Sequence, residues 1–573
     1  MKHFLRFVLL VLAFTVAAFS QEVFFRIKLD STSTGTTSTG KGSGYAILSS
    51  DRKSLQYDVT VNKLAGTISA AHFHYLPTSG VIHGVTFTGN TTSGTWTNIP
   101  DTIAVALLSG NIYLNVHSST APGGEIRGIV DVEQFGFPLK LDGPTAGTTS
   151  AGRGSGYVVF NKNSDTGSVS TISYRATYAG LQGTITGAHF HALPSGNVVH
   201  PVAFVDSTLD ETWTNPADSI LTLFLHQKMY LNIHSSVSPG GEIRATGNLV
   251  GEIPFAGILD GTQAGTASTG KGTAWAILRP DLSVKYNATY AKLLGTFSGA
   301  HFHTADGGGV IKPVTFSSNN TFGDWTGLSD KNLQDLLRGR VYLNVHSSVN
   351  PGGEIRANMT LQNGLFEAVL DGTQAGTTSK GKGTAWVYFT MDSVRYHATI
   401  AGLEGTFSGS HFHTANGGGI VKPVTFIDST TTGYWNLGSS HNDLLSGKIY
   451  LNIHSSINPG GEIRGNFTLG TGTVTSVIQQ ISTAAPNHFA LDQNYPNPFN
   501  PSTTINYRLT ASSNVTLKVY DLLGKEIATL VNQEQTAGGY SVKFDAPKFA
   551  SGIYFYQLRA GNFVQMKKMM LVK

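Results

Sequence analysis

Short stretches in which apolar and polar residues alternate run along most of the chain. The first part contains SLQYDVTV, GTISAAHFHYL, GVTFTG, GNIYLNVHSS and GEIRGIVDV, separated by Gly, Ser, Asn and Pro. Alternation with a period of two predicts β-strands that bury one face. The stretch 329–340 differs, because a capping serine, leucines at helical spacing and closing basic residues predict a short helix there. The pattern as a whole predicts an all-β, antiparallel protein.

This pattern repeats four times along the chain. YLNVHSSTAPGGEIRG (Tyr113–Gly128) returns as YLNIHSSVSPGGEIRA (Tyr230–Ala245), YLNVHSSVNPGGEIRA (Tyr342–Ala357) and YLNIHSSINPGGEIRG (Tyr450–Gly465). Each copy follows a His-Phe-His triplet, and successive units are 110 to 117 residues apart. This spacing is too long for a solenoid repeat and suits an independently folding domain. We therefore expect tandem antiparallel β-sandwich or barrel modules.

Composition narrows the possible functions. The 573 residues carry a net charge of +4 and no basic block, which argues against nucleic acid as a partner. The absence of cysteine excludes disulfides and Cys-ligated metals. A basic start, the apolar run Phe7–Phe19 and small residues before Gln21 predict a secretory signal peptide. No later segment is long and apolar enough to span a membrane, so we expect no transmembrane segment in the mature chain.

Three motifs of the repeat occur together and in a fixed order. AHFH, YLNVHSS and PGGEIRG, in a β-rich unit of about 110 residues, resemble the CHRD domain, which is named after chordin. Four copies cover roughly residues 22 to 470. The resemblance implies an extracellular β module, and for animal members it points to the binding of secreted signalling proteins.

The composition changes near Leu491. The segment LDQNYPNPFNPSTTINYRL, followed by VTLKVYDLLGKEIATL and ASGIYFYQLRAGNFVQMKKMMLVK, is similar to the type A C-terminal sorting domain of bacterial type IX secretion. This resemblance implies that the type IX secretion machinery is a partner and that the protein is secreted or attached to the outer-membrane surface. Alternation in GIYFYQL and VTLKVYDLLG predicts a small Ig-like β-sandwich.

These observations divide the chain into seven segments. They are a signal peptide at 1–20, CHRD-like units at 22–133, 134–250, 251–362 and 363–470, a linker at 471–488 and the sorting domain at 489–573.

The paired histidines are the candidate functional residues. Residues two apart in a strand share a face, so His72 and His74 project together, and a neighbouring YLNVH strand would bring His117 beside them. Three neutral imidazoles form a ligand set that Zn²⁺ or Cu²⁺ accepts. The candidate metal ligands are His72, His74, His117, His189, His191, His234, His301, His303, His346, His411, His413 and His454. Across the Pro-Gly-Gly hairpin we expect supporting polar residues in the same patch, namely Glu125, Arg127, Glu242, Arg244, Glu354, Arg356, Glu462 and Arg464.

Two points about this site stay open. Histidines that are hydrogen-bonded to Asn, Glu and Arg can form a purely structural network instead of a metal site. Strict alternation also places Ile68 on the face of the histidine pair, whereas Leu114 and Val116 send His117 outward. A β-bulge before the pair would reconcile the two patterns. A metal site further requires that the three ring nitrogens converge within about 4 Å of one another.

A fourth histidine ligand is not general among the units. His83 and His200, in the first two units, are replaced by Lys312 and Lys422 in the last two. We therefore expect three histidines to suffice.

Together these features favour an exported, non-enzymatic surface protein, for which we nominate no catalytic residue. Four copies of one site on one chain give avidity for a repetitive target such as a surface glycan or an extracellular protein. The alternative is a copper-dependent redox protein similar to Cu,Zn superoxide dismutase, in whose β-sandwich a His-x-His strand also occurs. GTTSTGKGSG (Gly35–Gly44) falls short of a phosphate-binding loop, because Gly42 stands where that loop needs Ser or Thr.

Overall fold

The computed structural model describes residues 22–469 except 33, 77, 134, 164, 306–307, 363, 390–392 and 416–417. It also describes residues 479–482 and 489–572 except 495–496, 498, 500–501, 522–525, 536, 547–549 and 562. The predicted signal peptide and most of the predicted linker lie outside the described residues.

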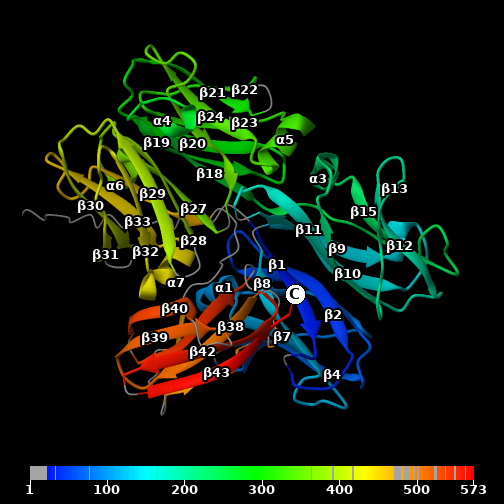
Figure 1. Cartoon of the computed structure of the whole chain (residues 1–573). Helices are drawn as coiled ribbons and strands as arrows, with labels where there is room; N and C mark the ends of the chain where they lie inside the picture. The colour runs from blue at the N-terminus through cyan, green and yellow to red at the C-terminus, as the bar shows by residue number, and fades with distance from the viewer. Residues whose placement is uncertain are drawn as a thin grey trace, which may run out of the picture.

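The first eight strands form one antiparallel sheet that curls around apolar side chains, and we call this unit module 1 (residues 23–132; Figure 1). The strand order is β5-β4-β7-β8-β1-β2-β3-β6. The elements are β1 (Val23–Asp30), β2 (Lys41–Leu48), β3 (Ser54–Asn62), β4 (Ile68–Tyr75), β5 (Gly80–Gly84), β6 (Thr91–Thr97), α1 (Asp101–Leu108), β7 (Ile112–Ser118) and β8 (Ile126–Val132).

Three further sheets repeat this order, each with one additional short strand. Module 2 (135–251) contains β9 (Phe135–Asp142), α2 (Gly143–Ala146), β10 (Arg153–Lys162), β11 (Val169–Ala179), β12 (Ile185–Ala192), β13 (Val198–Val202), β14 (Thr208–Thr214), α3 (Asp218–Leu225), β15 (Met229–Ser235), β16 (Ile243–Thr246) and β17 (Val250–Gly251). Module 3 (253–361) contains β18 (Ile253–Asp260), α4 (Gly261–Ala264), β19 (Lys271–Leu278), β20 (Val284–Ala291), β21 (Phe297–Thr304), β22 (Val310–Val314), β23 (Asn320–Trp325), α5 (Asp330–Leu337), β24 (Val341–Ser347), β25 (Ile355–Asn358) and β26 (Thr360–Leu361). Module 4 (365–469) contains β27 (Leu365–Asp371), α6 (Gly372–Ala375), β28 (Lys382–Phe389), β29 (Val394–Ala401), β30 (Phe407–Thr414), β31 (Ile420–Pro423), β32 (Thr430–Trp435), η1 (Gly438–Ser440), α7 (His441–Leu445), β33 (Ile449–Ser455), β34 (Ile463–Asn466) and β35 (Thr468–Leu469). The predicted all-β fold of antiparallel, barrel-like modules is confirmed.

Alternation decides which face of each strand is buried. In β4, Ala71 and Phe73 are 3% and 0% exposed, and in the paired strand β7, Leu114 and Val116 are both 0% exposed. These side chains fill the core, so the histidines between them lie on the outer face of the sheet. The predicted short helix is confirmed as α5, whose N-cap Ser329 accepts a hydrogen bond from the backbone of Asn332. The stretch GVTFTG, expected to be a strand, instead connects β5 to β6 beyond Gly84.

The four modules pack in a ring in which each touches two others (Figure 1). Modules 1 and 2 meet through β2, β3, β10 and β11, and modules 3 and 4 meet through the equivalent strands β19, β20, β28 and β29. Matching pairs of hydroxyl groups bond across both interfaces: Ser43 with Thr177 (2.9 Å), Thr60 with Ser155 (2.9 Å), Thr273 with Thr399 (2.7 Å) and Thr289 with Thr384 (2.6 Å). The two interfaces are therefore built in the same way.

The other two contacts of the ring are made by helices. Modules 2 and 3 meet through α3 and α5, and modules 1 and 4 meet through α1 and α7. In each pair the buried apolar residues of the two modules form one continuous cluster. The ring thus closes through two shared cores.

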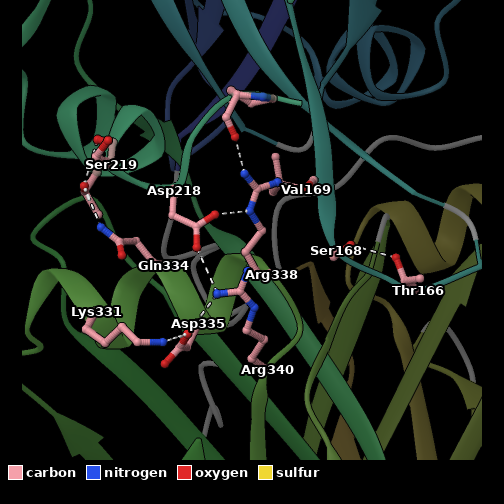
Figure 2. A network of polar contacts seen from close by, with 12 residues as sticks. Thr166, Ser168, Val169, Asp218, Ser219, Lys331, Gln334, Asp335, Arg338 and Arg340 are labelled. Atoms are coloured by element: carbon pink, nitrogen blue, oxygen red, sulfur yellow. Dashed lines mark hydrogen bonds and ion pairs between the residues drawn. The ribbon is translucent and has the colours of Figure 1, made fainter. Parts of the chain in front are cut away.

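Ion pairs reinforce the contact between modules 2 and 3 (Figure 2). The carboxylate of Asp218, at the start of α3, accepts hydrogen bonds from Arg338 (2.7 Å) and Arg340 (2.9 Å), which follow α5. Arg338 also donates to the backbone carbonyls of Val169 and Pro216 in module 2. Because one guanidinium satisfies three acceptors, this contact fixes the angle between the two helices.

The C-terminal part is a separate β-sandwich. Its two four-stranded sheets, with orders β36-β41-β38-β37 and β40-β39-β42-β43, share one apolar core. The strands are β36 (Gln479–Ser482), β37 (Ala490–Leu491), β38 (Ser502–Leu509), β39 (Ser513–Tyr520), β40 (Glu526–Gln535), β41 (Gly538–Asp545), β42 (Gly552–Ala560) and β43 (Phe563–Leu571). β36 lies within the predicted linker. Among the helices that the structure describes, none has the length and apolar character needed to cross a membrane.

Candidate metal centre

The three histidines of every module converge on the outer face of its sheet. In each set, one nitrogen per ring lies within 4.8 Å of the others, which is a looser convergence than the expected 4 Å. In three modules the Nδ1 atom of the first histidine faces the Nε2 atom of the third, at 3.3 Å for His72 and His117, 3.1 Å for His301 and His346, and 3.2 Å for His411 and His454. In module 2 the Nδ1 atom of His189 is buried and makes no hydrogen bond. Two ligands on one tetrahedral zinc ion are separated by roughly 3.3 Å when each bond is about 2.0 to 2.1 Å. The observed spacing therefore suits a shared ion. We call each set a His triad.

A β-bulge produces this convergence. The register between β4 and β7 shifts between Ile68 and Ala70, and the same shift occurs at the start of β12, β21 and β30. After the shift, His72 lies opposite Asn115 and His74 opposite Tyr113, so both rings project on the side of His117. Before the shift, Ile68 packs against the core. The two conflicting patterns in the sequence are thus both satisfied.

Backbone carbonyls fix the tautomers of two histidines in every triad. The Nδ1–H group of His74 donates to the carbonyl of Ser79 (2.9 Å), and that of His117 donates to the carbonyl of Pro122 (2.8 Å). The equivalent bonds in the other modules are 2.8 to 2.9 Å long. Because a carbonyl only accepts, Nδ1 carries the proton and Nε2 keeps its lone pair. Such carbonyl contacts are typical of metal-ligating histidines.

The lone pair of the second histidine has no partner. The Nε2 atoms of His74, His191, His303 and His413 are buried and make no hydrogen bond. Buried acceptors are nearly always satisfied, and leaving one bare costs about 1–3 kcal/mol. The same defect in all four modules indicates a site that is completed by a ligand. This orphaned acceptor, together with an all-imidazole donor set, fits Zn²⁺ or Cu²⁺.

A tyrosine and an arginine hold the second histidine in place. Tyr113 lies against His74 with ring centroids 5.0 Å apart and planes at 11°. The equivalent pairs in modules 2 to 4 are 5.1 to 5.2 Å apart, with planes within 8° of parallel. The expected supporting arginines, Arg127, Arg244, Arg356 and Arg464, lie over the other face of these tyrosines at 4.0 to 5.2 Å.

The first histidine of every triad is biased towards the neutral form that binds metals. Burial lowers the pKa of His72, and the neighbouring His117 and His74 lower it further. The pKa values of His189, His301 and His411 are lowered for the same reasons. Neutral imidazole is the ligand form, so fewer protons have to leave when a metal ion binds.

The expected position of the glutamates is wrong. Glu354 is 0% exposed, and its carboxylate accepts hydrogen bonds from Ser268 (2.6 Å) and from the backbone of Leu294 (2.5 Å) and Gly295 (3.2 Å) instead of facing His346. Glu125, Glu242 and Glu462 bind the same loops in their modules. Burial opposes their ionisation, but these hydrogen bonds outweigh it and lower the pKa of all four carboxyl groups. The glutamates therefore join the loops below the sheet and are not part of the triad.

His83 and His200 lie on the opposite face of the sheet. His83 pairs with Phe73 in the register of β4 and β5, and its ring stacks on Trp96 at 4.6 Å. His200 stacks on Trp213 at 4.0 Å. Neither belongs to a triad, which explains why Lys312 and Lys422 can replace them.

Sequence reasoning missed the tyrosine and the carbonyl groups that orient the triad. The tyrosine recurs at the start of all four YLN motifs, and alternation already placed it on the histidine face. The carbonyl of Pro122 belongs to the recurring Pro-Gly-Gly turn. The recurrence of these residues beside the histidines in all four units was the sequence signal that could have identified them.

Comparisons with known proteins agree with this architecture. Residues 21–130, 136–246, 255–359 and 366–467 match the CHRD domain family, and residues 493–573 match the secretion system C-terminal sorting domain. No curated protein matches the chain.

Solved structures align only loosely with the whole chain. They include the titin domains I67–I69 (7% identity, 51% of this chain and 92% of that chain, TM-score 0.12) and trypsin-activated alpha-2-macroglobulin from Escherichia coli (6%, 96% and 48%, TM-score 0.13). PorZ of Porphyromonas gingivalis, described as a surface component of the type IX secretion system, aligns at 8% identity over 94% of this chain and 81% of that chain, with a TM-score of 0.12. At these TM-scores the alignments carry no argument.

Proposed function

Because the chain belongs to the CHRD domain family and ends in a secretion sorting domain, we propose that it is an exported protein whose four modules each bind one transition-metal ion. The sorting domain indicates export to the cell surface or secretion. The metal-binding role is supported by one observation above all. In every module, two imidazoles are oriented by backbone carbonyls while the buried Nε2 atom of the second remains without a partner.

The ion is Zn²⁺ or Cu²⁺. Imidazole suits both ions, and carboxylate-preferring ions such as Ca²⁺ and Mg²⁺ find no oxygen ligand in the triads. The first histidine would bind through Nδ1, and the second and third through Nε2. The bound ion would act as a Lewis acid with a coordination position left for a water or a partner group.

The surroundings of the triads support a binding role. An exposed aliphatic side chain on the edge strand lies opposite the second histidine of each triad: Val81, Val198, Val310 and Ile420, which are 53 to 58% exposed. A metal ion beside an exposed apolar residue suits an extracellular protein that supplies both a coordinating side chain and an apolar contact. Four such sites on one chain give avidity for a repetitive surface.

Metal stoichiometry tests this proposal. The mature chain is stripped with a chelator, loaded with Zn²⁺ or Cu²⁺ and analysed by elemental mass spectrometry. We expect four equivalents per chain, and three after His191→Gln. The matched control is His200→Gln, which removes a histidine of the same module outside the triad and should retain four. A chain that takes up no metal, or a His191→Gln chain that keeps four equivalents, would contradict the proposal.

A copper-dependent redox protein is the second candidate. It is favoured by the partial exposure of the first and third histidines, which leaves the site open to a small oxidant. Turnover of superoxide by the copper-loaded chain would establish this activity if the rate falls by one step for each triad that is removed by substitution. Copper binding without turnover would leave the non-enzymatic function.

A further inference from the structure

Module 1 contains a cleft that borders its His triad. The cleft has a volume of about 920 Å³ and lies between the connection from β3 to β4 and the connection from β5 to β6. Leu64, Ile68 and Phe87 give it an apolar part, and His72 lines one end. A volume of about 300 to 1,000 Å³ is typical of sites for small organic ligands.

The cleft exists because module 1 lacks two aromatic residues of its relatives within the chain. Tyr178 of module 2 packs on Phe204 with ring centroids 5.1 Å apart, and Tyr290 of module 3 packs on Phe316 at 5.0 Å. Phe297 adds a third ring in module 3. Module 1 keeps the phenylalanine, as Phe87, but has Val61 and Ile68 at the positions of Tyr290 and Phe297. Smaller side chains at these positions leave space open.

Module 4 is intermediate and supports this explanation. It has an aliphatic residue, Ile400, at the position of Tyr290, and Phe407 at the position of Phe297. The rings of Phe407 and Phe426 pack with centroids 5.7 Å apart. Its equivalent cleft has a volume of about 340 Å³, at the lower end of the range for small ligands, and its lining residues include no histidine of the triad. Between modules 1 and 4, the larger cleft thus belongs to the module without an aromatic residue at these two positions.

His72 connects the cleft to the triad. Its Nδ1 atom faces His117 in the triad, and His72 is also one of the residues that line the cleft. Lys63, which also borders the cleft, is paired with Asp206 of module 2 at 3.1 Å, so it does not make the cleft a site for a strong anion. A ligand in the cleft would thus be recognised by an apolar surface and by the metal ion beside it.

We propose that module 1 binds a small organic molecule whose aromatic body lies in this cleft, on Ile68 and Phe87, and whose nitrogen or oxygen donor coordinates the metal ion of the adjacent triad. This inference rests on the proposed function for the coordinating step, but the cleft itself is independent of it. Modules 2 and 3 bind the ion without an aromatic ligand, because their own aromatic rings occupy the equivalent space.

Two probes test the ligand class in the metal-loaded, full-length mature chain. Imidazole offers only the donor group, and 4-phenylimidazole adds an aromatic ring. By calorimetric titration, we expect one of the four sites to bind 4-phenylimidazole at least about tenfold more tightly than imidazole, since burial of a phenyl ring favours binding by that amount or more. Four equivalent sites would overturn the proposal.

Variants taken from the chain's own modules identify the site. Val61→Tyr with Ile68→Phe gives module 1 the residues of module 3, and we expect it to abolish the tighter site. Ile68→Phe alone gives module 1 the aromatic residue that module 4 has at this position, and it should weaken the tighter site of module 1. This single variant provides a test even if the double variant does not fold. The reverse change, Tyr290→Val with Phe297→Ile, should create a second tight site. Unchanged titrations in all three variants would refute the assignment.

Saturation-transfer NMR of the metal-free chain separates this inference from the proposed function. We expect the phenyl protons of 4-phenylimidazole to receive saturation from the wild-type chain and to lose it in the Val61→Tyr, Ile68→Phe variant. If the chain binds no metal and this signal persists, the cleft is a ligand site and the metal function is refuted. If metal binds in four equivalents but this signal is absent, the cleft proposal alone is refuted.

Discussion

The second histidine of each triad lies between a tyrosine ring and a backbone carbonyl. In module 3, Tyr342 covers one face of His303 at 5.2 Å, and the carbonyl of Gly308 accepts from its Nδ1 at 2.8 Å. The carbonyl fixes the tautomer and the tyrosine fixes the plane of the ring, so both determine where Nε2 points. Groups that orient a ligand in this way affect metal affinity without touching the ion.

Removal of the tyrosine should therefore weaken the site without abolishing it. We expect Tyr342→Leu to lower the metal affinity of module 3 by about 10- to 100-fold, because the ring of His303 becomes free to turn. Competition with a chelator of known affinity measures the change. Tyr434, which is 63% exposed in module 4, provides the control, and Tyr434→Leu should bind all four ions as the wild type does. Equal affinities in the two variants would show that the stack has no orienting role.

At the scale of elements, the Pro-Gly-Gly hairpin positions the third histidine. Gly353 has φ of +123°, and a Cβ atom there would come 2.2 Å from Oδ1 of Asn344. The neighbouring Gly352 has open space around its Cβ position. The hairpin also supplies the carbonyl of Pro351, which accepts from Nδ1 of His346. The geometry of this turn and the orientation of the histidine are thus linked.

A pair of alanine substitutions tests this link. Gly353→Ala should lower the free energy of unfolding of module 3 by about 2–4 kcal/mol, through backbone strain and the contact with Asn344. Its metal affinity should fall as well. Gly352→Ala adds the same methyl group one residue earlier and should leave stability within about 0.5 kcal/mol of the wild type. Urea unfolding and metal competition measure both effects, and similar losses in the two variants would be evidence against this role of the turn.

The sequence allowed most of the strands, α5 and the membership of each triad to be predicted, because alternation and recurrence are local signals. The expected strand GVTFTG was wrong, because this stretch connects β5 to β6. The bulge followed from the conflict between Ile68 and His117. The position of Glu354 could not be predicted from the sequence, because its partners Leu294 and Gly295 are about sixty residues away and their amide groups have no sequence signature. The stack on Tyr342 depends on the register of β21 and β24, which a period of two leaves undetermined.

On the scale of the whole molecule, the contact between modules 3 and 4 buries a carboxyl group. The Oε2 atom of Glu367 is buried and makes no hydrogen bond, while Thr468 donates to its Oε1 at 3.3 Å. Trp275 and Trp386 form the apolar cluster of this interface. Burial, together with the nearby Glu252, raises the pKa of Glu367 to about 8, and burial raises that of Glu252 to about 7 against the attraction of Arg279 and Lys285. This interface could not be predicted from the sequence, since its Ser and Thr residues are those of an exposed strand face.

This carboxyl group should make the stability of the ring depend on pH. The folded state favours the protonated form of Glu367, and the unfolded state ionises above about 4.5. The stabilising contribution is therefore complete below about pH 4.5 and is lost as the pH rises through about 8. We expect the free energy of unfolding to fall by about 1–3 kcal/mol between pH 5 and pH 9.

Substitution by glutamine checks the origin of this dependence. Glu367→Gln should reduce the pH dependence of urea unfolding, followed by tryptophan fluorescence, because glutamine stays neutral throughout. The raised pKa of Glu252 leaves a smaller dependence of the same sign. Glu404→Gln, at an exposed position of the same module, should leave the profile unchanged. A pH dependence that is undiminished in Glu367→Gln would assign it to other groups.

Ring closure limits how such an array can grow by gene duplication. Every module uses two faces, one formed by strands such as β2 and β3 and one formed by its helix, and the two kinds of contact alternate around the ring. A fifth copy inserted into the chain would meet no free face of either kind, and it would separate a pair that now shares a core. An alternating cycle closes only with an even number of members. Duplication of a pair of modules would allow the ring to close, whereas addition of a single module would leave it open.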